Sequence, residues 1–72
     1  MIRLLVKEIA ERQGYNMSTL SRASDVSFKT VKRIFRNPYT GVTVDTLNRL
    51  AKALKVSITD LMIEEPDKEE EA

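Results

Sequence analysis

Two helix signals separated by a very short turn constrain this chain more than any other feature. Asn16 and Ser27 are both favourable N-caps. They predict a short helix that runs to about residue 24 and a second helix over residues 28–36. The connection between them is only Asp25-Val26. Two helices so closely joined must cross steeply, and Asp tolerates the left-handed backbone that such a turn requires.

The segment before these helices also has helical periodicity. Ile2, Leu5, Val6 and Ile9 recur at i, i+3, i+4 and i+7, which is one face of a helix. Gly14 is a natural C-cap, so this first helix is predicted to end near it. No strand pattern is recognisable before the C-terminal tail.

Two further helices are predicted after Asn37-Pro38, because proline disfavours a helical conformation in the residue before it. Thr43 caps the first of them. Ser57 and Asp60 have the spacing of a capping box, which opens the last, short helix. The side chains expected to face inward from the second, third and fourth helices are Leu20 and Ala23; Val31, Ile34 and Phe35; and Val44, Leu47, Leu50, Ala51 and Leu54. The expected fold class is therefore all-α, a compact bundle of five short helices.

Length and composition exclude several kinds of site. A chain of 72 residues is one domain at most, and it contains neither Cys nor His. Thiolate nucleophiles, the usual general base and the usual zinc ligands are therefore missing, and we expect no catalytic residues, no metal and no cofactor. No apolar run approaches the roughly 20 residues that span a bilayer. The charged start is unlike a signal peptide, so we expect a cytoplasmic protein that does not bind membranes.

The net charge of +1 is divided unevenly along the chain. Residues 1–63 carry eleven basic and five acidic residues, whereas residues 64–72 carry six acids and one Lys. We expect residues 1–63 to be the folded domain and residues 64–72 to be an acidic, disordered tail. A basic body of this kind indicates a polyanionic partner.

The helix predicted over residues 28–36 carries most of this positive charge on its outer face. Opposite its inward side chains lie Phe28, Lys29, Lys32, Arg33 and Arg36. Like charges at i, i+4 are mildly destabilising in a helix, and no acid on this helix relieves them. The major groove of B-DNA admits one α-helix, with phosphates at its margins and base edges at its centre. The stripe therefore favours DNA over a merely solvated basic surface.

The segments "LSRASDVSFKTVKRI" and "VTVDTLNRLAKALKVSITDL" resemble the Cro/C1-type (Xre-like) helix-turn-helix domains of bacteria and their phages. The resemblance covers roughly residues 3–63. It implies a lambda-repressor-like DNA-binding fold, in which five helices share one core and the third helix reads the major groove. It further implies that such a protein binds double-stranded DNA as a homodimer, on an inverted repeat.

Site residues follow from the resemblance position by position. It implies that bases are read by Phe28, Lys29, Lys32 and Arg33. It implies that phosphates are contacted by Asn16, Met17, Ser27, Arg36, Tyr39, Thr40, Gly41 and Thr43, with Met17 and Gly41 acting through their backbone. Phe28 has two interpretations: its ring contacts a thymine methyl group, or it folds back onto the second helix and shields the core.

One departure from the family pattern predicts a packing contact. Many members pair an Arg on the first helix with a Glu near the end of the third, where this chain has Ala10 and Phe35. Because both charges are missing together, neither is left buried without a partner. We expect Phe35 to pack onto Ala10.

The function expected from these observations is a sequence-specific transcriptional regulator, a repressor, and not an enzyme. An antitoxin-like protein that binds a protein partner as well as DNA is the alternative, with the acidic tail as the segment that folds on that partner. For the homodimer, the apolar residues without an assured place in the core are Leu4, Ile58, Met62 and Ile63.

Overall fold

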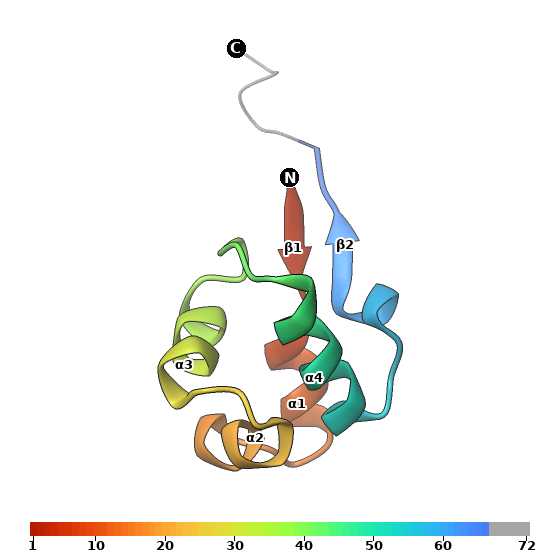
Figure 1. The fold of residues 1–72 in the computed structure, drawn as a ribbon. Helices are drawn as coiled ribbons and strands as arrows, with labels where there is room; N and C mark the ends of the chain where they lie inside the picture. Colours follow the sequence, from red (N-terminus) through yellow and green to blue (C-terminus); the bar gives the residue numbers. More distant parts are fainter. Residues whose placement is uncertain (67–72) are drawn as a thin grey trace.

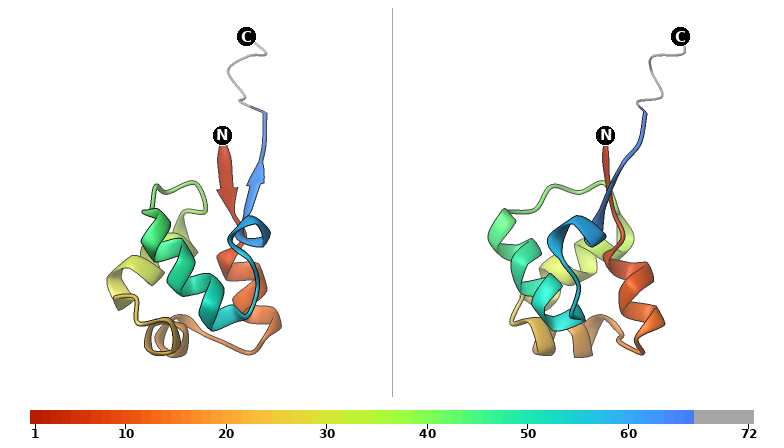
Figure 2. Two further views of the ribbon diagram at one scale, coloured as in Figure 1. Left: turned by 45° about the vertical axis from the view of Figure 1, so that its right-hand side comes forward. Right: turned by 90° about the vertical axis from the view of Figure 1, so that its right-hand side faces the viewer.

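The computed structural model describes residues 1–66 of the chain, and within them four α-helices pack into one body from which a two-stranded ribbon projects (Figure 1). One turn of 3₁₀ helix, η1, joins the last α-helix to the second strand. The ribbon lies at the end of the body opposite α2 in all three views (Figures 1 and 2). In chain order the elements are β1 (Ile2–Leu4), α1 (Val6–Arg12), α2 (Met17–Ser24), α3 (Phe28–Arg36), α4 (Val44–Leu54), η1 (Ile58–Leu61) and β2 (Met62–Glu64).

The helix-turn-helix unit of α2 and α3 has the limits that its caps predict. The Asn16 side chain accepts a hydrogen bond from the backbone N–H of Thr19, and the Ser27 hydroxyl accepts one from that of Thr30. Asp25 adopts the left-handed conformation, with φ 59° and ψ 33°. Val26 is buried beneath the turn. The local sequence therefore determines both helices and the turn between them.

The core lies between the four helices and contains most of the side chains expected there. The buried apolar residues are Leu4, Val6, Ala10, Leu20, Val26, Val31, Ile34, Leu47, Leu50, Ala51, Leu54 and Leu61, with Phe35 partly buried against them. Two expectations were wrong. Ala23 is exposed, and Ser24 is buried in its place because its hydroxyl donates to the Leu20 carbonyl at 2.7 Å. Val44 is 73% exposed, since α4 begins there and its first turn lies outside the core.

The N-terminal segment forms a strand, which corrects the prediction of an all-α protein. β1 pairs with β2 in an antiparallel register that places Arg3 opposite Ile63. α1 consequently begins only at Val6, and Ile2 is exposed on the ribbon instead of lying on a helix. The spacing that suggested a longer helix was fortuitous, because Ile2 belongs to a different element from Val6 and Ile9.

The fifth helix and the start of the tail also differ from expectation. Asp60 accepts a hydrogen bond from the Ser57 N–H at 3.1 Å, as the capping box predicts, but the helix that it opens is a single 3₁₀ turn. The described part of the chain therefore has four α-helices instead of five helices. Glu64, which we assigned to the tail, is the last residue of β2. Glu65, also assigned to the tail, donates its N–H to the Met1 carbonyl at 2.8 Å. The last six residues of the predicted disordered tail, 67–72, lie outside the described residues.

None of the described helices has both the length and the apolar character needed to cross a membrane.

Candidate nucleic-acid interface

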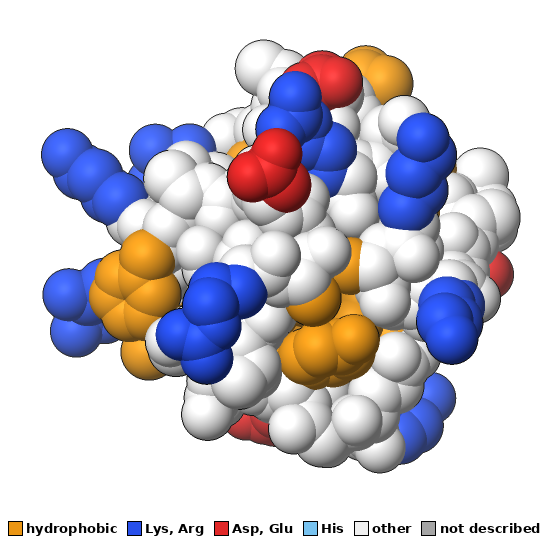
Figure 3. Space-filling model, turned by 60° about the horizontal axis from the view of Figure 1, so that its bottom comes forward, with side chains coloured by type: hydrophobic (Ala, Val, Ile, Leu, Met, Phe, Trp, Pro, Cys, Tyr) orange, Lys and Arg blue, Asp and Glu red, His pale blue; other side chains and the backbone are white. Residues whose placement is uncertain are grey.

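The outer face of α3 gathers the basic side chains that the sequence places on it. Lys29, Lys32, Arg33 and Arg36 line one shallow hollow together with Asn37. Within residues 1–66, none of these four cations takes part in an ion pair. Figure 3 shows Lys and Arg side chains extending outward at the left, the side on which α3 lies in Figure 1. The hollow is therefore a concentration of positive charge that lacks an internal counterion in the described structure.

The packing of α3 fixes the direction in which these cations point. Val31 and Ile34 are buried to 1% exposure or less and hold the helix against the core. Arg33 and Arg36 lie in its last turn, where basic side chains interact favourably with the helix dipole. The basic face is thus presented by a rigid element and not by a loop.

The N-termini of α2 and α3 add to the positive potential. Neither helix has an acidic residue in its first turn, so the backbone N–H groups there keep their attraction for anions. The capping bonds use Asn16 Oδ1 and the Ser27 hydroxyl oxygen as acceptors. Asn16 still has its Nδ2 amino group to donate, and Met17, partly buried against the core, has only its backbone N–H.

A second hollow connects α3 with the loop before α4. Arg33 lines it beside Gly41 and Thr43, two of the predicted phosphate contacts. Thr30 and Thr46 line it as well, and sequence reasoning did not select them. Each is the partner of an N-cap, Ser27 for Thr30 and Thr43 for Thr46, so the caps themselves were the signal that would have found them.

The local geometry does not require glycine at position 41. A Cβ atom built on it would meet nothing within 4 Å, and its φ lies outside the left-handed region. The lack of a side chain there leaves the loop backbone open to approach by a large ligand, which agrees with a backbone contact.

Tyr39 is already engaged within the protein. Its hydroxyl donates a hydrogen bond of 2.8 Å to Glu65 Oε1, and this bond raises the pKa of Tyr39 above its ordinary value, with smaller effects of desolvation and of the Glu65 charge in the same direction. The Glu65 carboxylate also lies 3.9 Å from Arg3. Tyr39 lies in the loop before α4, and this loop is also held by the Leu4 N–H, which donates to the Pro38 carbonyl at 2.7 Å. Tyr39 must therefore leave Glu65 if its hydroxyl is to bind a phosphate.

Phe28 lies at the start of α3 with 46% of its surface exposed. It is not among the side chains packed against the core, and it does not line the hollow of the four cations. The interpretation in which its ring shields the core is therefore not favoured. A ring exposed at the N-terminus of α3 is available to an external apolar group.

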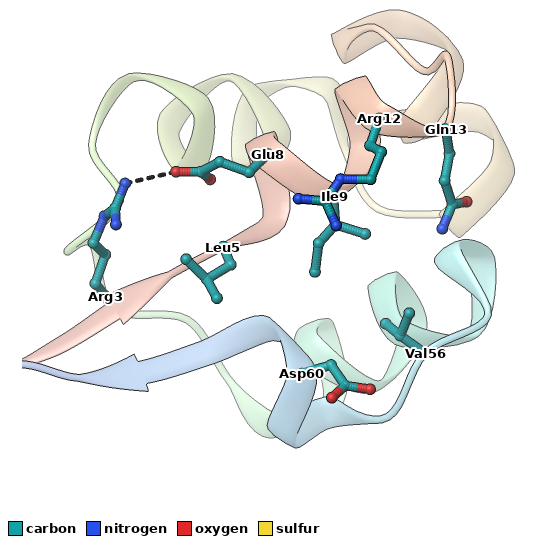
Figure 4. A pocket seen from close by; sticks show the side chains of 8 residues that line it. All are labelled: Arg3, Leu5, Glu8, Ile9, Arg12, Gln13, Val56 and Asp60. Atoms are coloured by element: carbon teal, nitrogen blue, oxygen red, sulfur yellow. Dashed lines mark hydrogen bonds and ion pairs between the residues drawn. The ribbon is translucent and has the colours of Figure 1, made fainter.

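Two carboxylates, Glu8 and Asp60, line the hollow between α1 and η1 (Figure 4). Arg3 pairs with Glu8 at 2.6 Å, and Asp60 caps η1. Both carboxylates therefore have partners in the fold. The described residues contain no group of three or more His, Cys, Asp or Glu side chains that could hold a metal ion.

The comparison with known families agrees with this geometry. A family model described as the Cro/C1-type HTH DNA-binding domain matches residues 6–67, which include all four α-helices. The chain belongs to the Cro/C1-type HTH family. A search of curated proteins gave no match.

One residue that supports the Cro/C1-type motif was not predicted. Arg49, on α4, donates from Nη1 to the Asp25 carbonyl at 3.1 Å and from Nε to Asp45 at 3.1 Å. It thereby ties α4 to the turn between α2 and α3. The signal in the sequence was only the i, i+4 spacing of Asp45 and Arg49, since the contact with Asp25 spans 24 residues.

Proposed function

We propose that this Cro/C1-type domain is a sequence-specific transcriptional regulator of double-stranded DNA, with α3 in the major groove. The observation that carries the proposal is the hollow of four basic side chains on α3, which lack an internal counterion among the described residues. A polyanion supplies the negative charge that these four side chains lack. A helix with its cations on one face fits the major groove, where Arg and Lys match the O6 and N7 acceptors of guanine.

Within this proposal the residues fall into two groups. Phe28, Lys29, Lys32 and Arg33 read bases, and Lys29 or Arg33 contacts guanine. Phosphates are contacted by Asn16, Met17, Ser27, Arg36, Tyr39, Thr40, Gly41 and Thr43. The hollow that Arg33, Gly41 and Thr43 line together supports this proposal, because a side chain proposed to read bases lies there beside two residues proposed to contact phosphates.

The regulator acts in the cytoplasm as a repressor, without enzymatic activity. A small domain covers only a short stretch of duplex, and it represses by occupying that stretch. It binds as a homodimer to an inverted repeat, because one copy makes few phosphate contacts and binds weakly at physiological salt. Half-sites about 10 bp apart place two copies on the same side of the duplex.

Selection from a randomised duplex pool, at two salt concentrations that span the physiological value, tests the proposal. We expect enrichment of an inverted repeat with half-sites about one helical turn apart. Binding that is strong at low salt, disappears at physiological salt and enriches no sequence would reject specific recognition.

Three single substitutions then separate base reading from phosphate contact. Arg33→Ala is expected to lower affinity for the selected site about 10-fold to 100-fold and to relax preference at one position. Arg36→Ala is expected to weaken all sequences alike and to reduce the salt slope by about one unit. Lys52→Ala, a matched loss of one charge on exposed α4 surface, serves as the control. If all three substitutions lowered DNA affinity equally, binding would depend on the overall charge of the protein alone.

A further inference from the structure

The Glu65 carboxylate joins two parts of the fold that are far apart in the sequence. Its Oε1 accepts the 2.8 Å hydrogen bond from the Tyr39 hydroxyl, and its Oε2 lies 3.9 Å from Nη1 of Arg3, on β1. The bond to Glu65 is the main cause that raises the pKa of Tyr39, whereas the charge of Arg3 lowers this pKa. Two donors from different elements therefore face one anion.

Arg3 is held in place without the help of Glu65. Its Nη2 donates to Glu8 at 2.6 Å, and Figure 4 shows the side chain extending from β1 toward this partner on α1. The next residue, Leu4, donates its backbone N–H to the Pro38 carbonyl, which fixes β1 beside the loop before α4. Nη1 of Arg3 consequently remains available to a second anion.

Tyr39 lies among the residues that we propose to contact phosphates. Arg36 precedes it by three residues, and Thr40 follows it directly. The backbone N–H of Tyr39 donates to Asn37 Oδ1 at 3.1 Å, which holds the turn after α3. The residue is 46% exposed, so a duplex that contacts Arg36 and Thr40 can also reach the hydroxyl of Tyr39.

We propose that Arg3 and the Tyr39 hydroxyl form a binding site for one phosphate of the DNA backbone, and that Glu65 occupies this site in the free protein. This inference rests on the proposed function, because it needs a duplex along α3. A phosphodiester offers negatively charged oxygens to the two donors, as a carboxylate does, and hydrogen bonds to charged acceptors are the stronger ones. Arg3 is thus a phosphate contact that the sequence did not indicate.

Exchange of Glu65 for a phosphate requires little rearrangement. The backbone N–H and C=O of Glu65 are both bonded to Met1, so they can remain paired while the side chain turns away. The ion pair of Arg3 with Glu65 is long and partly exposed, so it contributes little to stability. Once displaced, the Glu65 carboxylate stays near the phosphates and repels them. Glu65 therefore lowers the affinity for every DNA sequence alike.

Removal of the Glu65 charge provides the first test. In Glu65→Gln, affinity is expected to rise about fivefold, by the same factor for the selected site and for a random duplex. Glu64→Gln is the matched control, because it removes the same charge from the neighbouring residue, whose carboxylate lies 3.7 Å from the N-terminal ammonium. It should change affinity by less than about twofold. Equal gains in the two variants would overturn the proposal.

Removal of each donor from the Glu65→Gln protein provides the second test. Adding Arg3→Gln is expected to reduce the salt slope of DNA binding by about one unit, because one phosphate contact is lost. Adding Tyr39→Phe should lower affinity about threefold without changing the slope, since it removes no charge. Lys52→Gln, on the exposed surface of α4, is the control for the loss of one positive charge. The proposal fails if Arg3→Gln and Lys52→Gln have the same salt slope.

Thermal unfolding checks that the variants are folded. Arg3→Gln also removes the ion pair with Glu8, whereas Tyr39→Phe leaves that pair intact and tests the site independently. If Tyr39→Phe is folded and binds DNA as tightly as its Glu65→Gln parent, the hydroxyl does not contact a phosphate and the proposal is overturned.

The phosphate site and the proposed function fail in different ways. Binding to a selected sequence, with equal affinities of Glu65→Gln and Glu64→Gln, would reject the phosphate site alone. A gain of affinity in Glu65→Gln for a random duplex, with no sequence selected, would support the site and reject the sequence-specific regulator. Absence of binding to any duplex at low salt would reject both.

Discussion

Ala10 has none of its side chain exposed, and α1 packs against both α3 and α4 around it. Its small size matches the partly buried ring of Phe35, although their direct contact stays a prediction. The family pattern of a buried Arg and Glu is replaced here by two uncharged residues. Restoring only one of the charges should then be costly.

Ala10→Arg is expected to lower the free energy of unfolding by about 3 to 5 kcal/mol, because it buries a charge without a partner. Urea denaturation measures the change. Glu11→Arg, on the exposed face of the same helix, should change it by less than ~0.5 kcal/mol. An unchanged melting temperature for Ala10→Arg would count against tight packing at this site.

Phe28→Ala is expected to change stability little, since nearly half of the side chain is already exposed. It should lower affinity for the selected site more than affinity for a random duplex. Val31→Ala, which truncates a side chain with 0% exposure, is the matched control and should cost about 2 kcal/mol of stability. Equal weakening of all DNA sequences with a loss of stability would instead show that Phe28 supports the fold.

At the scale of the element, α4 ends at Lys55 in a conformation that its residue type does not favour. Lys55 has φ 60° and ψ 42°, the left-handed region in which glycine is preferred at a helix end. Nothing in the sequence predicted a left-handed Lys at this position, whereas Asp25 was predicted because Asp tolerates that conformation.

Lys55→Gly is expected to stabilise the domain by about 0.5 to 1 kcal/mol, because relief of the left-handed backbone exceeds the entropic cost of glycine. Chemical denaturation measures the gain. Lys52→Gly, within α4, should instead cost ~1 kcal/mol. Destabilisation by both substitutions would mean that the Lys55 side chain stabilises the domain by more than its left-handed backbone destabilises it.

The elements that the sequence predicted are those determined by local interactions. The limits of α2 and α3 follow from N-caps and a turn within three or four residues of each helix. The ribbon was missed because its strands have only three residues each and pair across nearly the whole chain, so neither has a detectable period. An N-terminal strand was therefore mistaken for the beginning of α1.

In the candidate site, too, the features that could be predicted are those set by local sequence. The cations of α3 were placed correctly because helical periodicity decides which face they occupy. The engagement of Tyr39 was missed because its partner Glu65 is 26 residues away and had been assigned to the tail. The N-caps mark Thr30 and Thr46 in the sequence, but the hollow that the two share forms between elements and follows only from their packing.

At the scale of the whole molecule, the bond between Tyr39 and Glu65 makes one contribution to stability dependent on pH. The phenol must be protonated to donate, and its pKa in the folded state is raised above 10.0 chiefly by this bond. The contribution is fully present below that value and is lost as pH rises through the folded-state pKa.

In Tyr15→Phe, Tyr39 is the only tyrosine, since the chain has two. Absorbance of the phenolate in this variant is expected to rise with a midpoint above pH 10.0. Adding Glu65→Gln should lower that midpoint, because the charged acceptor is removed. A midpoint that Glu65→Gln does not move would show that the hydrogen bond is absent in solution.

The pairing of β1 with β2 has a consequence for the order of events during synthesis. β1 leaves the ribosome before the four helices and β2 leaves it after them, so β1 waits unpaired while the four helices are made. The helix-turn-helix, built from contacts between near neighbours, can form early. The ribbon closes last. The contacts through which Leu4 and Glu65 hold the loop before α4 therefore also form last.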